Sequence, residues 1–190
     1  MFMRPKTFIT SDLHLDHTNI IKYCKRPFLN AKDMNKTLID NWNNTISNKD
    51  IVYFLGDLAY GIGSKSTDYW LKQLNGKIIF IKGNHDKSNK IKFHETYLLN
   101  YRGYKFFLSH MPVQVPKDSG HQSTLEYFPS NEPEQFEKNC NIWAIYGHHH
   151  NNNLKKHPFI DKKNRRINVS TELTNFRPID MDDLIKKIEE

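Results

Sequence analysis

The sequence predicts an α/β fold in one domain spanning residues 1–190. Short apolar runs of strand type alternate with segments whose apolar residues recur at helical spacing. Hydrophobic residues make up 37% of the chain and aromatic residues 13%, so one sizeable core can be buried. No internal repeat or low-complexity linker divides the chain, which also favours a single domain.

The predicted elements follow in chain order. Strands are expected over residues 6–10, 51–55, 77–81, 104–108, 142–146 and 166–169. Helices are expected over residues 30–47, 64–74 and 181–190. The first helix is the best defined, because its apolar residues recur at helical spacing from Met34 to Ile46. Ser64 or Ser66 would cap the second helix, and Gly76 would stop it.

Residues 111–139 interrupt this alternation. The segment holds four prolines and little periodicity before a short helix expected over residues 132–138. A long irregular segment inside a compact domain usually has a function. We therefore expect a lid or a pocket wall here, and not a second domain.

The net charge of +7 favours an anionic partner, because the summed field attracts phosphate-bearing ligands. Genome composition would give the same excess of lysine, so charge alone does not decide. A basic stretch lies near the last polar cluster and consists of Lys155, Lys156, Lys162, Lys163, Arg165 and Arg166. Two interpretations stay open for it, a solvated loop or a guide for nucleic acid whose binding would weaken steeply with salt.

Residue usage predicts a cytoplasmic protein without a membrane anchor. The longest apolar runs, such as residues 78–81, are far shorter than the ~18 residues of a membrane span. The N-terminal residues lack the apolar region of a signal peptide. Cys24 and Cys140 lack the paired spacing of a zinc or disulfide framework, which suits a reduced compartment. A disulfide between them stays an alternative, and nothing predicts the oligomeric state.

Five of the predicted strands end in side chains that bind metals. These side chains are Asp12 and His14, then Asp57, then Asn84 with His85 and Asp86, then His110, and finally His148 and His150. Because ligands gather at the carboxyl ends of strands, adjacent strand ends would pool these groups in one crevice. Carboxylates and neutral imidazoles suit Mn, Fe, Zn or Ni, and calcium prefers more oxygen ligands.

The spacing within the clusters indicates which way the side chains point. Asp12 and His14 are two residues apart, so an extended chain would point both to the same side. His148 and His150 repeat this spacing, with His149 pointing away. The glycine before three of the clusters suits turns where the backbone adopts unusual dihedral angles or approaches a ligand closely. One such cluster alone is a common surface turn, but five in order after strands are hard to attribute to chance.

These motifs resemble the signature of the calcineurin-like metallophosphoesterases, in particular the small single-domain bacterial and phage members. The matching motifs are Asp12-x-His14, Gly56-Asp57, Gly83-Asn84-His85-Asp86, His110 and Gly147-His148-x-His150. Supporting similarity comes from His17, Arg26-Pro27-Phe28 and Asn168-Val169-Ser170. The resemblance implies a four-layer α-β-β-α sandwich of two mixed β-sheets, of the metallo-dependent phosphatase type, with two metal ions at one edge.

The resemblance also implies a role for each motif residue. One divalent metal ion would be held by Asp12, His14 and His150. The other would be held by Asn84, His110 and His148. Asp57 would bridge the two ions, His85 would lie beside the phosphate as a general acid, and Asp86 would orient His85. Mn²⁺ is the expected ion, with Fe, Zn or Ni as alternatives.

The chemistry expected from such a site is hydrolysis of phosphate monoesters or diesters. Two cations ~3.5–4 Å apart lower the pKa of a bridging water, so that hydroxide attacks phosphorus in line. A histidine that titrates near pH 7 can protonate the leaving oxygen. A nucleotide is one candidate substrate. A nuclease with the same chemistry and a non-catalytic binding module on this fold stay as alternatives.

Three further residues are candidates for substrate binding. His17 would line the phosphate pocket or cap the next helix. The guanidinium of Arg26 would clamp a phosphate, or form a surface ion pair or a packed stem. His121, in the irregular segment, would reach the pocket. His94 and His157 belong to no cluster and are expected at the surface.

Overall fold

The computed structural model describes residues 4–88, 90–113 and 142–190. The helices are α1 (Thr18–Tyr23), α2 (Ala31–Thr45), α3 (Thr67–Leu71) and α4 (Met181–Glu189), with short 3₁₀ turns at Lys162–Asn164 and Thr171–Thr174. The strands are β1 (Thr7–Thr10), β2 (Ile51–Phe54), β3 (Lys77–Ile81), β4 (Phe93–His94), β5 (Thr96–Tyr101), β6 (Tyr104–Ser109), β7 (Ile142–Tyr146), β8 (Ile160–Asp161), β9 (Arg166–Asn168) and β10 (Ile179–Asp180). No described helix is long and apolar enough to cross a membrane.

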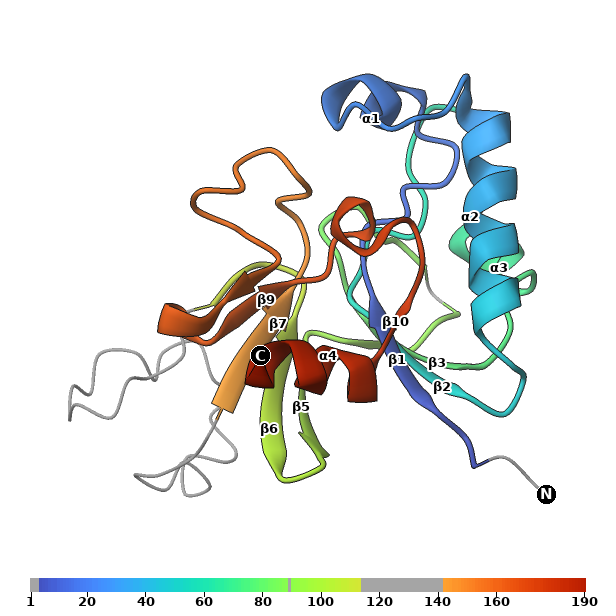
Figure 1. The fold of residues 1–190 in the computed structure, drawn as a ribbon. Helices are drawn as coiled ribbons and strands as arrows, with labels where there is room; N and C mark the ends of the chain where they lie inside the picture. Colours follow the sequence, from blue (N-terminus) through green and yellow to red (C-terminus); the bar gives the residue numbers. More distant parts are fainter. Residues whose placement is uncertain (1–3, 89, 114–141) are drawn as a thin grey trace.

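The strands form two mixed sheets (Figure 1). The first has the order β10-β1-β2-β3-β4, with β1 to β4 parallel and β10 antiparallel at the edge. The second has the order β5-β6-β7-β9-β8, with β6, β7 and β9 parallel. All parallel strands within a sheet therefore deliver their carboxyl ends to the same edge.

Alternating side chains of the first sheet divide between two apolar clusters. Phe8, Val52 and Phe54 pack in one cluster with the buried stripe of α2, including Trp42. The neighbouring residues on the same strands, such as Ile9, face the second sheet in the other cluster, to which α4 also contributes. This alternation follows from the two-residue period of a strand and places the core between the sheets. In Figure 1, α2 and α3 cover the side of the first sheet away from the second sheet.

The expected α/β fold with two mixed sheets is confirmed. A helical layer on the outer face of the second sheet is not found among the described residues and stays a prediction. The lid-like segment at 111–139 and the short helix at 132–138 lie outside the described residues, except for residues 111–113. Cys24 is buried and free.

The predicted helices and strands occur with ends that shift by a few residues. Asn30 caps α2 by accepting from the Asp33 amide, and Ser66 caps α3 by accepting from the Tyr69 amide. Helix α1 and strand β5 were not predicted, and neither were the two-residue strands β4, β8 and β10. Helix α1 is six residues long and β5 carries partly exposed residues at most positions, so neither has a clear apolar period.

Candidate metal centre

The side chains predicted to bind metal lie at the joined edges of the two sheets. Beyond their strands, Asp12 donates its amide to the Gly56 carbonyl at 3.0 Å. The Gly147 amide likewise donates to the His110 carbonyl at 3.0 Å. A parallel bridge between Ser11 and Ser170 links the first sheet to the second at this point. The structure therefore brings together all five strand ends that the sequence singled out.

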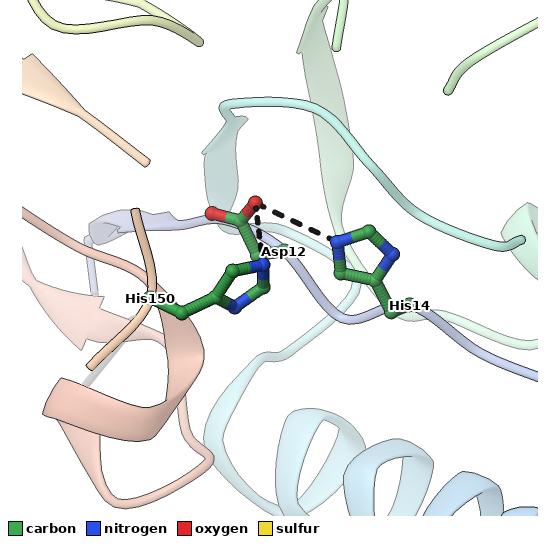
Figure 2. Close-up of side chains that lie close together, drawn as sticks. All are labelled: Asp12, His14 and His150. Carbon is green, nitrogen blue, oxygen red and sulfur yellow. Dashed lines mark ion pairs between the residues drawn. The ribbon is translucent and has the colours of Figure 1, made fainter. Parts of the chain in front are cut away.

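Asp12, His14 and His150 form one group of facing donor atoms (Figure 2). Asp12 Oδ1 lies 3.8 Å from His14 Nε2 and 3.8 Å from His150 Nε2. The other oxygen of Asp12 is held by the protein, because the His148 amide (2.9 Å) and the Ser170 hydroxyl (3.1 Å) donate to it. One carboxylate oxygen is thus fixed by hydrogen bonds while the other faces two imidazoles.

Asn84, His110 and His148 form a second group. Asn84 Oδ1 lies 2.9 Å from His110 Nε2 and 3.0 Å from His148 Nδ1. The two imidazole nitrogens are 3.2 Å apart. His110 donates Nδ1–H to the Leu55 carbonyl at 2.7 Å, so in the neutral ring Nε2 keeps its lone pair for this group.

Asp57 lies between the two groups. Its Oδ2 is 3.5 Å from His14 Nε2 and 3.4 Å from His110 Nε2. Its Oδ1 accepts the His85 amide at 2.9 Å. One carboxylate oxygen therefore faces donor atoms of both groups, which is the position that a bridging ligand would occupy.

Unpartnered buried atoms show that these residues fit a metal centre. Among the described residues, Asp12 Oδ1 and both ring nitrogens of His14 are buried without a hydrogen-bond partner. Burying an unsatisfied polar group costs about 1–3 kcal/mol, and more for a charged group. A divalent cation would satisfy the carboxylate oxygen and His14 Nε2 together, and this donor set of carboxylate, imidazole and amide oxygen suits a transition metal.

The pKa shifts of Asp57 and His14 agree with this fit. His150 differs, because burial lowers its pKa but Asp12 and Glu172 raise it to about 11, so it would have to lose a proton to bind a cation. Burial raises the pKa of Asp57 to about 7, with the Asp12 carboxylate adding to the rise and His110 opposing it. Burial also holds the pKa of His14 well below its usual range, and His150 lowers it further. His14 is therefore neutral at pH 7, the form that binds metals. A nearby cation would stabilise the ionised form of Asp57.

Glu172 orients His150 and was missed by the sequence analysis. Its carboxylate accepts from His150 Nδ1 at 3.0 Å, which leaves Nε2 free to face Asp12. Carboxylates commonly hold the outer nitrogen of a metal-binding histidine in this way. The signal was available, because Glu172 follows the parallel strand β9, whose carboxyl end reaches the same edge.

Arg26 is buried behind the site, and its guanidinium is occupied by protein partners. Its guanidinium donates to the Asp12 carbonyl (2.8 Å), the Leu13 carbonyl (2.7 Å) and the Glu172 carboxylate (2.8 Å). Only 4% of the residue is exposed. Arg26 braces the first motif and neutralises Glu172; the packed-stem alternative is closer to what is found.

The geometric reason given for the Asp-x-His and His-x-His spacings was wrong. An extended chain was expected, but Asp12, His14, His148 and His150 all have left-handed backbone, with φ of 60°, 51°, 68° and 48°. Asp57 has φ of 60° as well. These side chains converge because the chain turns sharply after β1, β2 and β7. Such dihedral angles cost about 1–3 kcal/mol each in residues other than glycine, and they concentrate at functional sites.

Two glycines allow the strand ends to approach one another. A Cβ atom on Gly83 would overlap the Asp57 carboxylate and backbone. One on Gly147 would overlap Ser11 and the Asp12 carboxylate. The close approach expected at these glycines is therefore found. Each glycine lies against a candidate metal ligand of a neighbouring strand end, Asp57 for Gly83 and Asp12 for Gly147.

His85 and Asp86 belong to neither donor group. His85 lies at the edge of the site, with 33% of its side chain exposed and Nε2 3.9 Å from Asp57 Oδ2. Asp86 accepts the amides of Asp57 (2.7 Å), Gly83 (2.8 Å) and Leu58 (3.1 Å), and the structure shows no hydrogen bond between it and His85. Asp86 therefore braces the turn that carries Asp57.

The remaining predicted residues differ in their placement. His17 lies next to His14, with ring centroids 5.4 Å apart, and gives α1 no side-chain cap. His121 lies outside the described residues. His157, expected at the surface, is buried and stacks on His149 with ring centroids 3.6 Å apart. Asn168 donates to the His157 backbone carbonyl at 3.3 Å.

A cavity of about 1200 Å³ lies at the other end of β1, lined in part by Arg4, Lys6 and Arg177. None of the candidate metal ligands lines it. The donor atoms, and not the size of a cavity, therefore mark the candidate site.

Comparison with known proteins places the whole chain among relatives of similar length. A family model described as calcineurin-like phosphoesterase matches residues 5–187. The chain is 47% identical over 190 residues to an uncharacterized protein of Methanocaldococcus jannaschii, covering 100% of this chain and 94% of the relative. It is 27% identical over 146 residues to the gene 66 protein of Mycobacterium phage D29, covering 73% of this chain and 71% of the phage protein.

A solved structure shares the fold. The crystal structure of a protein of unknown function from Aquifex aeolicus matches with a TM-score of 0.65 and 21% identity. The match covers 96% of this chain and 99% of that protein. It supports the arrangement of two mixed sheets.

Replacing Asp86 by Asn should destabilise the protein. The amide group of Asn would face backbone N–H donors, so we expect the free energy of unfolding to fall by about 2–3 kcal/mol. Urea denaturation in EDTA measures this. Asp40→Asn is the control, because Asp40 forms an exposed pair with Lys36 and its loss should change stability by less than about 1 kcal/mol. Wild-type stability combined with slow turnover would show instead that Asp86 acts on His85.

Asp57→Asn should raise the melting temperature in EDTA at pH 8, by about 2–4 °C per kcal/mol gained. The pKa of about 7 in the folded protein exceeds the unfolded value of about 3.9. Below about pH 4 the carboxyl of Asp57 is protonated in both states and does not oppose folding. As pH rises from about 4 to 7, its ionisation increasingly lowers the stability of the folded protein, and above pH 7 the full loss applies. Adding Mn²⁺ should stabilise the wild type and not the variant. Differential scanning fluorimetry measures both melting temperatures. A variant that melts below the wild type in EDTA and is stabilised by Mn²⁺ would contradict the prediction.

Proposed function

The chain belongs to the calcineurin-like phosphoesterase family, and from this premise we propose that it hydrolyses phosphate esters with two divalent metal ions. The family implies phosphate-ester substrates, and the buried Asp and His groups are consistent with its metal site. The observation that carries the two-ion proposal is the place of Asp57. Its Oδ2 lies within 3.5 Å of a histidine nitrogen in each of two separate donor groups.

We assign one ion to Asp12, His14 and His150, the other to Asn84, His110 and His148, and Asp57 to both. When bound, the ions supply a Lewis acid for the phosphoryl oxygens and a water of lowered pKa. The protein holds the donor atoms in place through Glu172, which fixes His150, and the Leu55 carbonyl, which fixes His110. Mn²⁺ is the ion we expect, because the donors mix oxygen and imidazole nitrogen.

His85 would hold the proton for the leaving oxygen. Among the described residues, it is the one histidine paired with Asp57 that is substantially exposed and that belongs to neither donor group. Burial and His110 lower the pKa of His85, while Asp86 and Asp12 oppose this. A phosphate anion bound beside the ring would raise the pKa again and favour the protonated form. Nucleic acid as substrate stays a prediction based on the charge of +7.

Asp57→Asn should abolish most turnover of an aryl phosphodiester measured with Mn²⁺. Loss of an outer hydrogen-bond partner of a metal ligand typically reduces activity by about 10–100-fold, and loss of a shared ligand should exceed about 100-fold. Glu172→Gln, which changes the outer partner of His150 and also the buried ion pair with Arg26 but removes no metal ligand, gives the comparison on the same scale. Equal activity of the wild type and Asp57→Asn would remove the two-ion proposal.

His85→Ala should keep both metal ions but turn over poorly. General-acid help is typically worth about 10²–10⁴-fold, and it matters most for alcohols that leave with difficulty. The loss should therefore be large for alkyl esters and small for nitrophenyl esters. Metal content by atomic emission is the control. If the variant loses its metals, His85 is a ligand and the assignment is wrong.

A further inference from the structure

A row of aromatic rings leads from the candidate metal centre to the surface. Tyr60 lies against His85 with ring centroids 4.0 Å apart. The Tyr60 and His17 centroids are 4.9 Å apart, and those of His17 and Tyr23 are 6.3 Å apart. His14, a candidate ligand, is 5.6 Å from His85 and 5.4 Å from His17. The inner end of this aromatic row therefore touches the donor groups.

The backbone fixes the position of Tyr60. Leu15 and Ala59 form a parallel bridge, and the Tyr60 amide donates to the Leu15 carbonyl at 3.0 Å. These contacts continue the pairing of β1 and β2 beyond the ends of the strands. Tyr60 is thus carried on the same braced segment that follows Asp57, and its ring is held beside the site.

The outer rings of the row are exposed. Tyr60 is 43% exposed and Tyr23 65% exposed, although large apolar rings are usually covered. Both contact His17, so these two exposed rings lie together beside the candidate metal centre. Binding sites commonly combine such aromatic walls with a few fixed polar groups.

We propose that the aromatic row binds a planar aromatic group in the leaving alcohol of the substrate, with Tyr60 as the ring on which it stacks. This rests on the proposed function, in which His85 protonates the leaving oxygen. An alcohol with its oxygen at His85 has its next atoms beside Tyr60, because the two rings are in contact. The substrate class is therefore a phosphate ester whose leaving alcohol carries a flat aromatic ring, as benzyl alcohol and nucleosides do.

Benzyl phosphate and cyclohexylmethyl phosphate test this with the Mn²⁺-loaded protein. Their leaving alcohols are alike in size, and only one is planar. The wild type should prefer the benzyl ester about 10-fold in kcat/KM, Tyr60→Phe should keep the preference, and Tyr60→Ala should reduce it to less than about 2-fold. Tyr69→Ala is the matched control, since Tyr69 is 47% exposed on α3, and it should retain the preference.

Two more arms complete the experiment. Adenosine 5′-monophosphate carries a base that methyl ribofuranoside 5-phosphate lacks. A higher kcat/KM for the adenosine ester that depends on Tyr60 would identify a nucleobase as the aromatic group. Benzylphosphonate and cyclohexylmethylphosphonate are not hydrolysed, and calorimetry measures their binding without turnover.

The outcomes separate the two proposals. Hydrolysis of both benzyl and cyclohexylmethyl esters with a preference unchanged by Tyr60→Ala would overturn the aromatic subsite and leave the proposed function standing. No hydrolysis of these monoesters or of the aryl phosphodiester, with benzylphosphonate still bound more tightly through Tyr60, would overturn the proposed function and support the subsite. Equal binding of the two phosphonates by the wild type would overturn the subsite.

Discussion

The carboxylate of Asp57 must lie between two groups of metal-binding side chains, each of which combines residues from both sheets. Its side chain faces His14 from the first sheet and His110 from the second. Its backbone is tied on both sides, because its carbonyl accepts the His14 amide at 3.0 Å and its amide donates to Asp86 at 2.7 Å. The rest of the site is arranged so that this one side chain can touch both groups.

Holding the site in this form opposes folding. Five of the seven candidate ligands have left-handed backbone, and several buried polar atoms have no partner among the described residues. Each such feature costs on the order of 1–3 kcal/mol. The two apolar clusters around the first sheet, with residues such as Trp42 and Ile145 fully buried, must outweigh this. Cations bound at the donor groups would recover part of it, so stability and metal binding are linked.

Much of this arrangement could be predicted from the sequence. Apolar runs ending in polar clusters identified the strands and the common edge, because parallel strands deliver their carboxyl ends together. The left-handed turns at Asp12 and His148 could not be predicted, since neither residue is a glycine and only the packed strand ends impose that backbone. The buried contacts of Arg26 could not be predicted for a related reason. Its partners are backbone carbonyls and Glu172, which is 146 residues away in the sequence, and no local pattern reports such contacts.

The most direct test of this account is a crystal structure of the Mn²⁺-loaded protein with anomalous scattering measured at the manganese edge. The account predicts two anomalous peaks about 3.5–4 Å apart, one on each side of the Asp57 carboxylate. A single peak, or peaks that do not contact Asp57, would contradict it.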